Sequence, residues 1–409
     1  MLNLKTNNFK NIYYHLIIFF FPISILIGNA AININIAIIL ISGIYVIFQK
    51  KIYAYFSQKW FLFALIFWFV ILISSFFSYY QIHSLTYTIT FLRFILFSLC
   101  IQVIFVEKKL SGINFIKYLI LLLFVVAIDT IIQKFFGKNI FLFEIIGDGF
   151  NSRLTSFFKD EAVVGSYISK FIFIPIFYLF FTESAKKVFK VKKNFLFYLI
   201  LMISLLAIFF TGERMASLHF LLGLFILFFF MLIRKKLSLK LLVFSLIILT
   251  SIFVFDKNIR ERFLHSFDKR YGIGNGIINS PWGSHLKAAS NMFKENAIIG
   301  TGPKTFRIYS CEKDYNKGDK RACSTHPHNI LAEILSETGV FGFIFLILFI
   351  FVFFKQNKLE DKFFGFTVSL LILLWPLGTS GSFFSTFNGS FIWYILGLLS
   401  AFKKIRYNN

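Results

Sequence analysis

The segment FLFYLILMISLLAIFFTGERMASLHFLLGLFILFFFMLI, residues 195–233, contains two apolar runs separated only by a short polar turn at residues 211–214. Runs of about 20 apolar residues are what a helix needs to cross a hydrocarbon core roughly 30 Å thick. The segment therefore predicts two transmembrane helices, at residues 195–211 and 215–233, joined by a very short turn.

The same pattern extends over the whole chain of 409 residues, of which 57% are hydrophobic and 15% charged, with a mean hydropathy of +0.75. A soluble domain of this size needs more polar surface, because folding buries only part of the unfolded chain. We therefore expect an all-α fold, a polytopic membrane helical bundle of about twelve transmembrane helices. The expected spans are residues 13–29, 31–48, 60–79, 86–106, 115–135, 162–182, 195–211, 215–233, 239–256, 329–354, 362–378 and 390–402.

Basic residues indicate how these spans are oriented. On a soluble chain the net charge of +24 would suggest nucleic acid. Here the basic residues cluster after the even-numbered spans, so we expect contact with membrane lipids and no nucleic-acid partner. By the positive-inside rule both termini are cytoplasmic, and the first run is a retained span rather than a signal peptide. The clusters are Lys50, Lys51 and Lys59; Lys108, Lys109 and Lys117; Lys186, Lys187, Lys190, Lys192 and Lys193; Arg234, Lys235, Lys236 and Lys240; Lys355, Lys358 and Lys362; and Lys403, Lys404 and Arg406.

Two long loops fall on the opposite side of the membrane, at residues 133–161 and 256–327. The second carries more basic than acidic residues, including Lys269 and Arg270, which long loops tolerate under the positive-inside rule. We expect a helix within it at residues 284–296. The chain is thus expected to divide into residues 1–255 with spans one to nine, residues 256–328 as a large helical loop, and residues 329–409 with spans ten to twelve.

The large loop contains two of the three cysteines, Cys311 and Cys323. Its compartment permits disulfides, and a bond that closes a loop of about a dozen residues would stabilise it by roughly 3 kcal/mol. The alternative is a zinc site formed by both cysteines with His326 and His328. Because this spacing matches no ordinary zinc module, we expect the disulfide and no metal.

Ionisable residues inside spans are costly to bury and therefore usually functional. With the orientation above, Arg93, Asp129, Lys170 and Arg214 all lie toward the side of the large loop. We expect Arg93 and Asp129 to form a structural pair. For Arg214 we expect a functional role, because the tight turn at residues 211–214 holds it rigidly at the membrane surface.

The segment STHPHN, residues 324–329, is expected to begin a short amphipathic helix at the outer interface, with Pro327 in its first turn and Gly339 at its end. His326 and His328 would then lie at the helix N-terminus, where the partial positive charge attracts anions and keeps an imidazole neutral. A neutral imidazole beside a phosphate is suited to act as a general base. The alternative that stays open is helix capping by His326, with His328 merely solvated.

Two further segments offer groups that bind phosphate. Residues 300–304, GTGPK, form a glycine-rich loop with Lys304, a pattern that can cradle phosphate but more often marks a turn. Residues 151–157 place Arg153 among hydroxyl side chains. Together with Arg214, these basic groups favour an anionic lipid as substrate.

The region of residues 279–342 resembles the signature region of the O-antigen ligase/polymerase superfamily. The turn TGERMAS at residues 211–217 resembles the arginine turn of that family, and RLTSF at residues 153–157 resembles its earlier arginine tract. The plan of twelve spans with one large late outer loop also fits. The pieces that match within the signature region are His285, Ala289, Met292 and Phe293; GTGPKTFR at residues 300–307; CSTHPHN at residues 323–329; and ETGVFG at residues 337–342.

This resemblance implies a glycosyltransferase of the bacterial inner membrane that uses no metal or other cofactor. It would transfer a glycan from undecaprenyl pyrophosphate to lipid A–core oligosaccharide, with its active site and large loop on the periplasmic face. Arg214 would be the main pyrophosphate ligand and His328 the base, with His326 beside it. Many members have an arginine shortly before the loop helix, where this chain has residues 282–285, and His285, Lys287 or Arg307 would replace it. The further candidates for pyrophosphate binding are Arg153, Arg307, Lys304 and His285.

Two other functions stay open. A polymerase of glycan repeat units would use the same chemistry and differ only in its acceptor, which no residue pattern reveals. A transporter of lipid-linked oligosaccharides would need polar residues through the full depth of the bundle and in both leaflets. The ionisable residues here gather toward one side, which favours an enzyme.

Overall fold

The structure is a computed structural model that describes residues 2–182, 193–235, 239–264, 279–358 and 360–405. Within these residues the regular secondary structure is helical, apart from the isolated β-bridges Lys138–Glu144 and Ile146–Arg153. The all-α prediction is therefore confirmed for the described residues. The basic residues Lys186, Lys187, Lys190, Lys192, Lys236, Lys269, Arg270 and Arg406 lie outside them.

Seven helices of the described chain are long and apolar enough to cross a membrane. They are α2 (Asn29–Lys50), α3 (Lys59–Phe76), α4 (Gln81–Glu107), α5 (Gly112–Phe136), the pair α6 (Val164–Phe171) and α7 (Phe173–Phe181), α10 (Arg214–Ile233) and α16 (Ile330–Gln356). The other expected spans coincide with helices α1 (Leu2–Ile27), α9 (Lys193–Phe210), α11 (Leu239–Phe255), α17 (Gly365–Leu373) and α18 (Thr386–Ile405). These five are shorter or less apolar within the described residues, so a bundle of twelve membrane-crossing helices stays a prediction.

Residue contacts divide the chain into two compact units. Unit 1 comprises Met1–Leu110, Gly272–Lys358 and Leu374–Asn409, and unit 2 comprises Ser111–Tyr271 and Leu359–Leu373. These units are defined by contacts between residues. The expected division, with boundaries after residues 255 and 328, was defined by the predicted membrane spans instead, and it stays a prediction.

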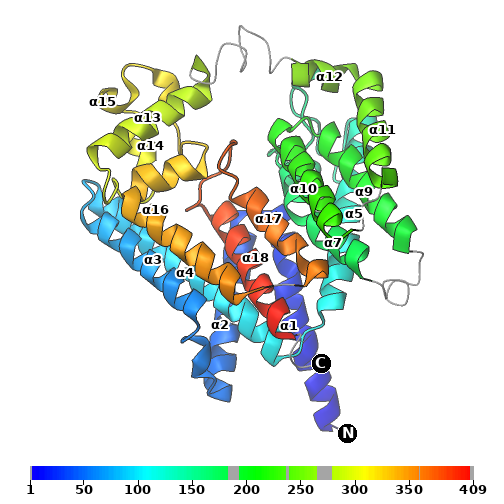
Figure 1. Cartoon of the computed structure of the whole chain (residues 1–409), viewed down its shortest axis with the longest axis horizontal. Helices are drawn as coiled ribbons and strands as arrows, with labels where there is room; N and C mark the ends of the chain where they lie inside the picture. Colours follow the sequence, from blue (N-terminus) through cyan, green and yellow to red (C-terminus); the bar gives the residue numbers. More distant parts are fainter. Residues whose placement is uncertain (1, 183–192, 236–238, 265–278, 359, 406–409) are drawn as a thin grey trace. The chain divides into compact units, whose positions relative to one another are not determined.

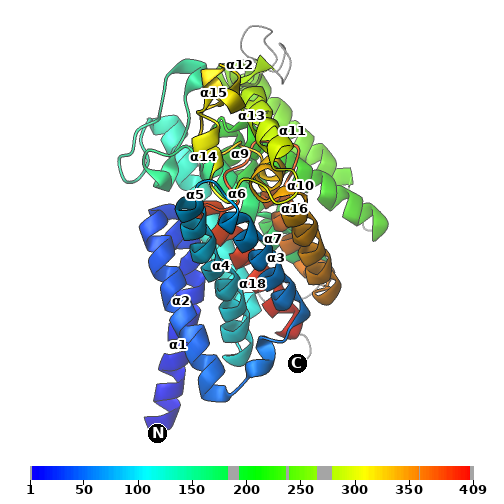
Figure 2. The same cartoon turned by 90° about the vertical axis from the view of Figure 1, so that its left-hand side faces the viewer.

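The membrane helices of unit 1 pack around α4, which contacts α2, α3 and α18, while α16 packs along α3 (Figures 1 and 2). Aromatic side chains fill the centre of this packing. The buried ring of Phe91 on α4 lies 5.6 Å from that of Phe383 and 6.0 Å from that of Trp393 on α18, measured between ring centroids. Burying such large side chains stabilises the contact through both apolar area and edge-on ring geometry.

Part of the expected large loop forms a small helical subdomain in unit 1. It contains α13 (Pro281–Glu295), α14 (Phe306–Tyr309), α15 (Lys313–Asn316) and the 3₁₀ turn η7 (Lys320–Ala322). The helix α13 begins where Ser280 accepts a hydrogen bond from the Gly283 amide and Pro281 occupies the first turn, a common helix start.

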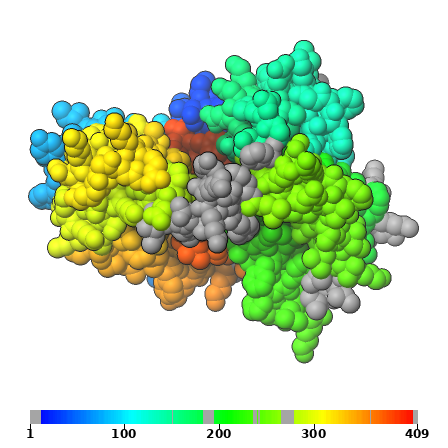
Figure 3. All heavy atoms as spheres, turned by 90° about the horizontal axis from the view of Figure 1, so that it is seen from above, coloured from blue at the N-terminus to red at the C-terminus, as the bar shows by residue number. Residues whose placement is uncertain are grey.

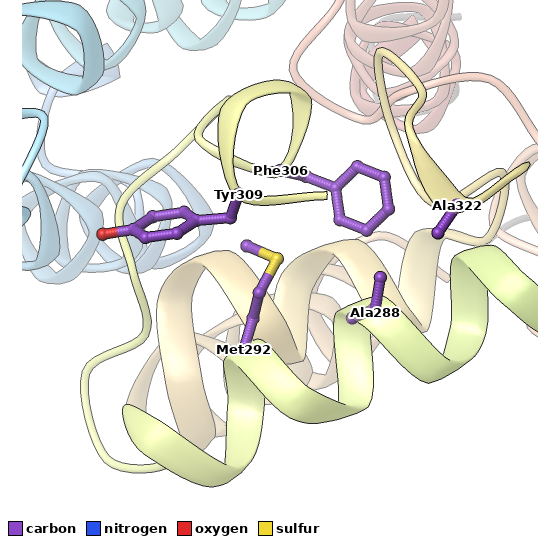
Figure 4. Packing of buried hydrophobic residues seen from close by; sticks show 6 residues of the cluster. Ala288, Met292, Phe306, Tyr309 and Ala322 are labelled. Carbon is purple, nitrogen blue, oxygen red and sulfur yellow. The ribbon is translucent and has the colours of Figure 1, made fainter. Parts of the chain in front are cut away.

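This subdomain has its own apolar core. Figure 4 shows Ala288 and Met292 on α13 facing Phe306 and Tyr309, with Ala322 beside them. Figure 3 shows its outer surface, in yellow, beside the light-blue end of α3 and α4. Hydrogen bonds join these parts, among them those from Ser78 Oγ to the Thr301 carbonyl at 2.5 Å and from the Tyr80 hydroxyl to Glu312 at 2.7 Å. The subdomain is therefore anchored to the helices of unit 1.

Unit 2 is built from the helices α5, α6, α7, α9, α10, α11 and α17, with α12 (Lys257–Leu264) following α11. Its helix α5 packs on α9, and α6 contacts α9 and α10. Lys134 on α5 forms an ion pair of 2.6 Å with Asp256, which ties the end of α5 to the start of α12.

Short 3₁₀ turns complete the regular structure of the described residues in both units. They are η1 (Tyr53–Tyr55), η2 (Gly149–Asn151), η3 (Ser156–Phe158) and η8 (Asp361–Phe363).

Arg93 and Asp129 lie in different units, and each has hydrogen-bond partners within its own unit, so the expected pair between them stays a prediction. Arg93 donates to Thr386 Oγ1 at 3.1 Å within unit 1. Asp129 accepts hydrogen bonds from the Ser156 hydroxyl, the Asn139 side chain and the Ile140 amide within unit 2. Asp129 thus holds the 133–161 loop against α5. This role depends on contacts with the loop and not on a charged residue in another span.

Candidate active site

Three histidines lie together in unit 1. His285 is on α13, and His326 and His328 are in the loop that precedes α16. The ring centroids of His326 and His328 are 4.0 Å apart, and those of His285 and His328 are 5.1 Å apart. The structure therefore brings both predicted catalytic histidines together with one of the predicted pyrophosphate ligands.

The helix after the histidines starts later than expected. Asn329 is its N-cap, with its side chain accepting a hydrogen bond of 2.9 Å from the Ala332 amide, and α16 begins at Ile330. His328 therefore lies before the cap, with a left-handed φ of 53°, and not in the first helical turn. The expected end at Gly339 is present as a break in α16, where φ is 65°. A side chain at Gly339 would collide with the Ile298 carbonyl.

Burial favours the neutral form of all three imidazoles. It lowers the pKa of His326 to about 3, with the charges of His328 and Lys304 adding to the effect. Burial also lowers the pKa of His328, assisted by His285, and it lowers the pKa of His285 against the opposing charge of Asp319. Desolvation, more than the helix terminus, thus provides the neutral imidazoles that base catalysis needs.

The polar face of the first α16 turns is buried and does not lie at a solvated interface. Glu333 accepts hydrogen bonds from the Ser382 hydroxyl at 2.5 Å and the Phe383 amide at 2.7 Å. Glu337 accepts from the amides of Lys304 and Phe306 at 2.7 and 3.0 Å. Both carboxylates therefore hold neighbouring segments of unit 1 against α16.

The glycine-rich loop at residues 300–304 is a packed turn. The Thr301 and Gly302 amides donate to the Ser336 and Glu337 carbonyls of α16. Lys304 is only 4% exposed, and its ammonium donates to Ser382 Oγ at 2.8 Å. Since the amides have protein partners, the loop has no set of free N–H groups to cradle phosphate, and the predicted phosphate contact of Lys304 rests on its ammonium alone and stays a prediction.

Arg307 is better placed to meet an anion in unit 1. Its guanidinium lies over the Tyr87 ring, 5.9 Å from the centroid, and donates weakly to the Tyr87 hydroxyl at 3.4 Å. Its Nε is buried and has no hydrogen-bond partner in the described structure. Near it, the His83 ring lies 4.9 Å from Tyr87.

A disulfide joins Cys311 to Cys323 beside this site. The bond engages both sulfurs, so neither cysteine is a thiolate that could bind zinc with His326 and His328. The Ser310 side chain and the Ser324 backbone hydrogen-bond each other in both directions, at 3.2 Å each, next to the two cysteines. The disulfide thus closes the loop immediately before the histidines.

A cluster of three arginines lies in unit 2. Two were predicted, Arg153 and Arg214, and the third is Arg262 on α12. Burial is the main cause that lowers the pKa of Arg262 to about 10; the nearby charges of Arg214 and Arg153 contribute to this shift, and Glu213 opposes it. Three guanidinium groups at one place form a strong site for a phosphate-bearing anion.

Arg262 was not singled out from the sequence, because its position depends on a contact with a distant turn. Its Nε donates to the Gly212 carbonyl at 2.5 Å. Gly212 has a φ of 67°, and a side chain there would approach the Arg262 Cδ to 2.8 Å. The glycine before the Glu213–Arg214 pair therefore makes room for the third arginine.

Residues 199–347 match the family model described as O-Antigen ligase. No curated protein matches the chain. This part of the chain, which includes Arg214, Arg262 and the histidine loop, is therefore similar to the O-antigen ligase family, and the match supports the resemblance seen in the motifs. The family implies a glycosyltransferase-like membrane enzyme that acts on a lipid-linked glycan and a lipid acceptor.

Proposed function

We propose that this protein transfers a glycan from undecaprenyl pyrophosphate to lipid A–core oligosaccharide on the periplasmic face of the bacterial inner membrane. The observation that carries this proposal is the cluster of imidazoles at His285, which is buried, and His326 and His328, which are partly buried, within the residues that match the family. Membrane enzymes that attack an activated sugar need a base of this kind beside the acceptor hydroxyl.

In the proposed reaction His328 removes the proton from the acceptor hydroxyl. The hydroxyl oxygen forms a bond to the anomeric carbon of the donor glycan, and the bond from that carbon to the pyrophosphate oxygen breaks. The leaving group is undecaprenyl pyrophosphate, and the proton held by His328 is then released to water. No metal or other cofactor takes part in this proposal.

Arg153, Arg214 and Arg262 would neutralise the charge that develops on the leaving pyrophosphate. Arginine suits this role because its planar guanidinium binds two phosphate oxygens at once. Arg307 and His285 are the further candidates for phosphate contacts in unit 1, where Arg307 Nε and His285 Nδ1 are buried without a partner in the described structure.

Polymerisation of glycan repeat units is the alternative within the same family, and it differs in the acceptor. Deleting the gene in its native host and separating the glycolipids on a gel distinguishes the two functions. A ligase deletion removes all long-chain glycan from lipid A. A polymerase deletion leaves a single repeat attached, and an unchanged pattern would contradict both. Reintroducing the wild-type protein should restore the pattern, whereas the His328→Ala variant should not.

A further inference from the structure

Ser380 contacts both predicted catalytic histidines through its backbone. Its amide donates a hydrogen bond of 2.8 Å to the His328 carbonyl, and its carbonyl lies 3.2 Å from His326 Nε2. Ser380 belongs to the segment of residues 376–383 between α17 and α18, which lies beyond the residues that match the family. The two backbone groups of Ser380 therefore hydrogen-bond one histidine each, the amide to His328 and the carbonyl to His326.

The contact with His326 determines which ring nitrogen carries the proton. A carbonyl oxygen can only accept a hydrogen bond, so His326 Nε2 must be the donor. In the neutral ring Nδ1 then has no proton and must accept. Thr325 Oγ1, 3.0 Å from Nδ1, is the group that donates to it. Both nitrogens of His326 thus already have partners.

The contact with His328 supports an unfavourable backbone. A left-handed φ is uncommon for a residue other than glycine and costs on the order of 1 kcal/mol or more. His328 has a φ of 53°, and the Ser380 amide holds its carbonyl in this conformation. The His328 ring is less constrained than that of His326, because its Nε2 has only a long contact of 3.4 Å with Ser324 Oγ.

The 376–383 segment is itself held firmly. Asn329 Nδ2 donates to the Pro376 carbonyl at 2.6 Å. Ser382 bridges Lys304 and Glu333, and the Phe383 amide also donates to Glu333. The bonds of Ser382 and Phe383 are buried, whereas that to Pro376 is exposed. Because these bonds fix the segment on both sides of Ser380, its backbone groups are preorganised before substrate binds.

We propose that residues 376–383 are the positioning element of the histidine pair, and that His326 is a positioning residue fixed as its Nε2–H tautomer by the Ser380 carbonyl. His328 is then the residue whose ring is available to take the acceptor proton. The inference rests on the proposed function for the identity of the reaction, but the tautomer of His326 is independent of it. Burial, which lowers the pKa of His326 to about 3, keeps this ring neutral over the working pH range.

The tautomer is measured directly by nitrogen NMR of the full-length protein in detergent, with histidine labelled in its ring nitrogens. The chain has seven histidines, and the His326→Gln variant identifies the His326 signals by their loss. We expect a protonated Nε2, a bare Nδ1 and no titration between pH 5 and 8. A protonated Nδ1, or a ring that titrates in this range, would overturn the inference. The result stands whether or not the purified protein transfers glycan.

Matched variants test the consequence for catalysis. A glutamine amide can place a donor near the position of Nε2, whereas asparagine can reach only the position of Nδ1. In a transfer assay His326→Gln should keep kcat within about tenfold of wild type and His326→Asn should lose about 100-fold, in line with general-base effects. Both should keep the fall in rate at acidic pH, which reports His328. Ile298→Ala, at a residue of unit 1 that is 63% exposed and lies outside the 376–383 segment, is the control and should leave transfer unchanged. Equal losses in His326→Gln and His326→Asn, or loss of the acidic limb in either, would show that His326 is itself the base.

Discussion

The Glu213 carboxylate caps the helix α6, where its Oε1 accepts a hydrogen bond of 2.7 Å from the Gly165 amide. Its Oε2 accepts a second bond from Ser166 at 3.1 Å. A carboxylate suits this place because the first amides of a helix lack partners and carry partial positive charge. The residue before Arg214 thus ties the arginine turn to α6, and it also lies near Arg153 and Arg262.

This cap makes stability depend on pH. Burial raises the pKa of Glu213 from 4.5 to about 7, against the opposing amides and the charges of Arg153 and Lys170. The folded state therefore binds a proton that the unfolded state has lost between pH 4.5 and 7. The stabilisation of the folded state by this proton is fully present below about pH 4.5 and is lost as the pH rises to about 7. It amounts to a total on the order of 3 kcal/mol in the free energy of unfolding.

Thermal unfolding in detergent between pH 4.5 and 8 measures this effect. The Glu213→Gln variant should lose the decrease in stability that wild type shows over this range. Glu261→Gln, at a side chain that is 44% exposed on α12, should retain it. Parallel curves for wild type and Glu213→Gln would show that Glu213 does not titrate in this range.

The arginine cluster should require guanidinium groups and not merely positive charge. Arg214→Lys and Arg262→Lys should each lower transfer by about tenfold or more, because an ammonium cannot bind two phosphate oxygens in a fork. Lys257→Ala, on the same helix as Arg262 with a side chain that is 75% exposed, should leave transfer unchanged. Glycan-transfer assays at equal protein abundance test this requirement for guanidinium groups. Wild-type turnover by Arg214→Lys would reduce Arg214 to a structural anchor.

The Cys311–Cys323 bond should stabilise the outer loop, and the enzyme should not need zinc. A double Cys→Ser variant, or reductant added to wild type, should lower the unfolding free energy by roughly 3 kcal/mol for a closed loop of this length. Transfer by the oxidised wild type should persist in a strong chelator. Free thiols in the native protein, found together with one bound zinc per chain, would disprove this prediction.

The orientation is tested by cysteines introduced at two exposed positions, Asp314 in the large loop and Lys358 after α16. A membrane-impermeant thiol reagent should label the cysteine at position 314 in intact cells of a strain with a permeable outer membrane. The cysteine at position 358 should react only with a permeant reagent. Labelling of position 314 only after the inner membrane is opened would reverse the topology.

Apolar runs predicted much of the helical structure. The segment from residue 195 to 233 forms the two helices α9 and α10 around the expected turn, and the helix expected at residues 284–296 is present as α13, which starts three residues earlier at Pro281 with Ser280 as its cap. Both patterns depend on residues close in sequence, where helix length and capping decide the outcome. The match of residues 199–347 to the O-Antigen ligase family supports the motif-based resemblance.

Features that depend on distant contacts were predicted poorly. Pro327 indicated a helix start, but Asn329 provides the cap that the helix uses, so His328 lies outside the helix. The helix after residue 329 was expected to be amphipathic and to lie at the outer interface, whereas Glu333 on its polar face is buried as an acceptor for Ser382, about fifty residues away. Arg262 likewise depends on Gly212, fifty residues before it. Local periodicity contains no information on such pairings.

The central claim is that His328 is the base that activates the acceptor hydroxyl. The most direct measurement is the pH dependence of glycan transfer by the reconstituted protein, comparing wild type with His328→Ala on an undecaprenyl-linked donor. Because burial lowers the pKa of His328, the wild-type rate should fall only below the ordinary histidine pKa of 6.5. The variant should lose this acidic limb, transfer about 10² to 10⁴ times more slowly, and still bind the donor. Near-normal transfer by His328→Ala with the acidic limb intact would contradict the account.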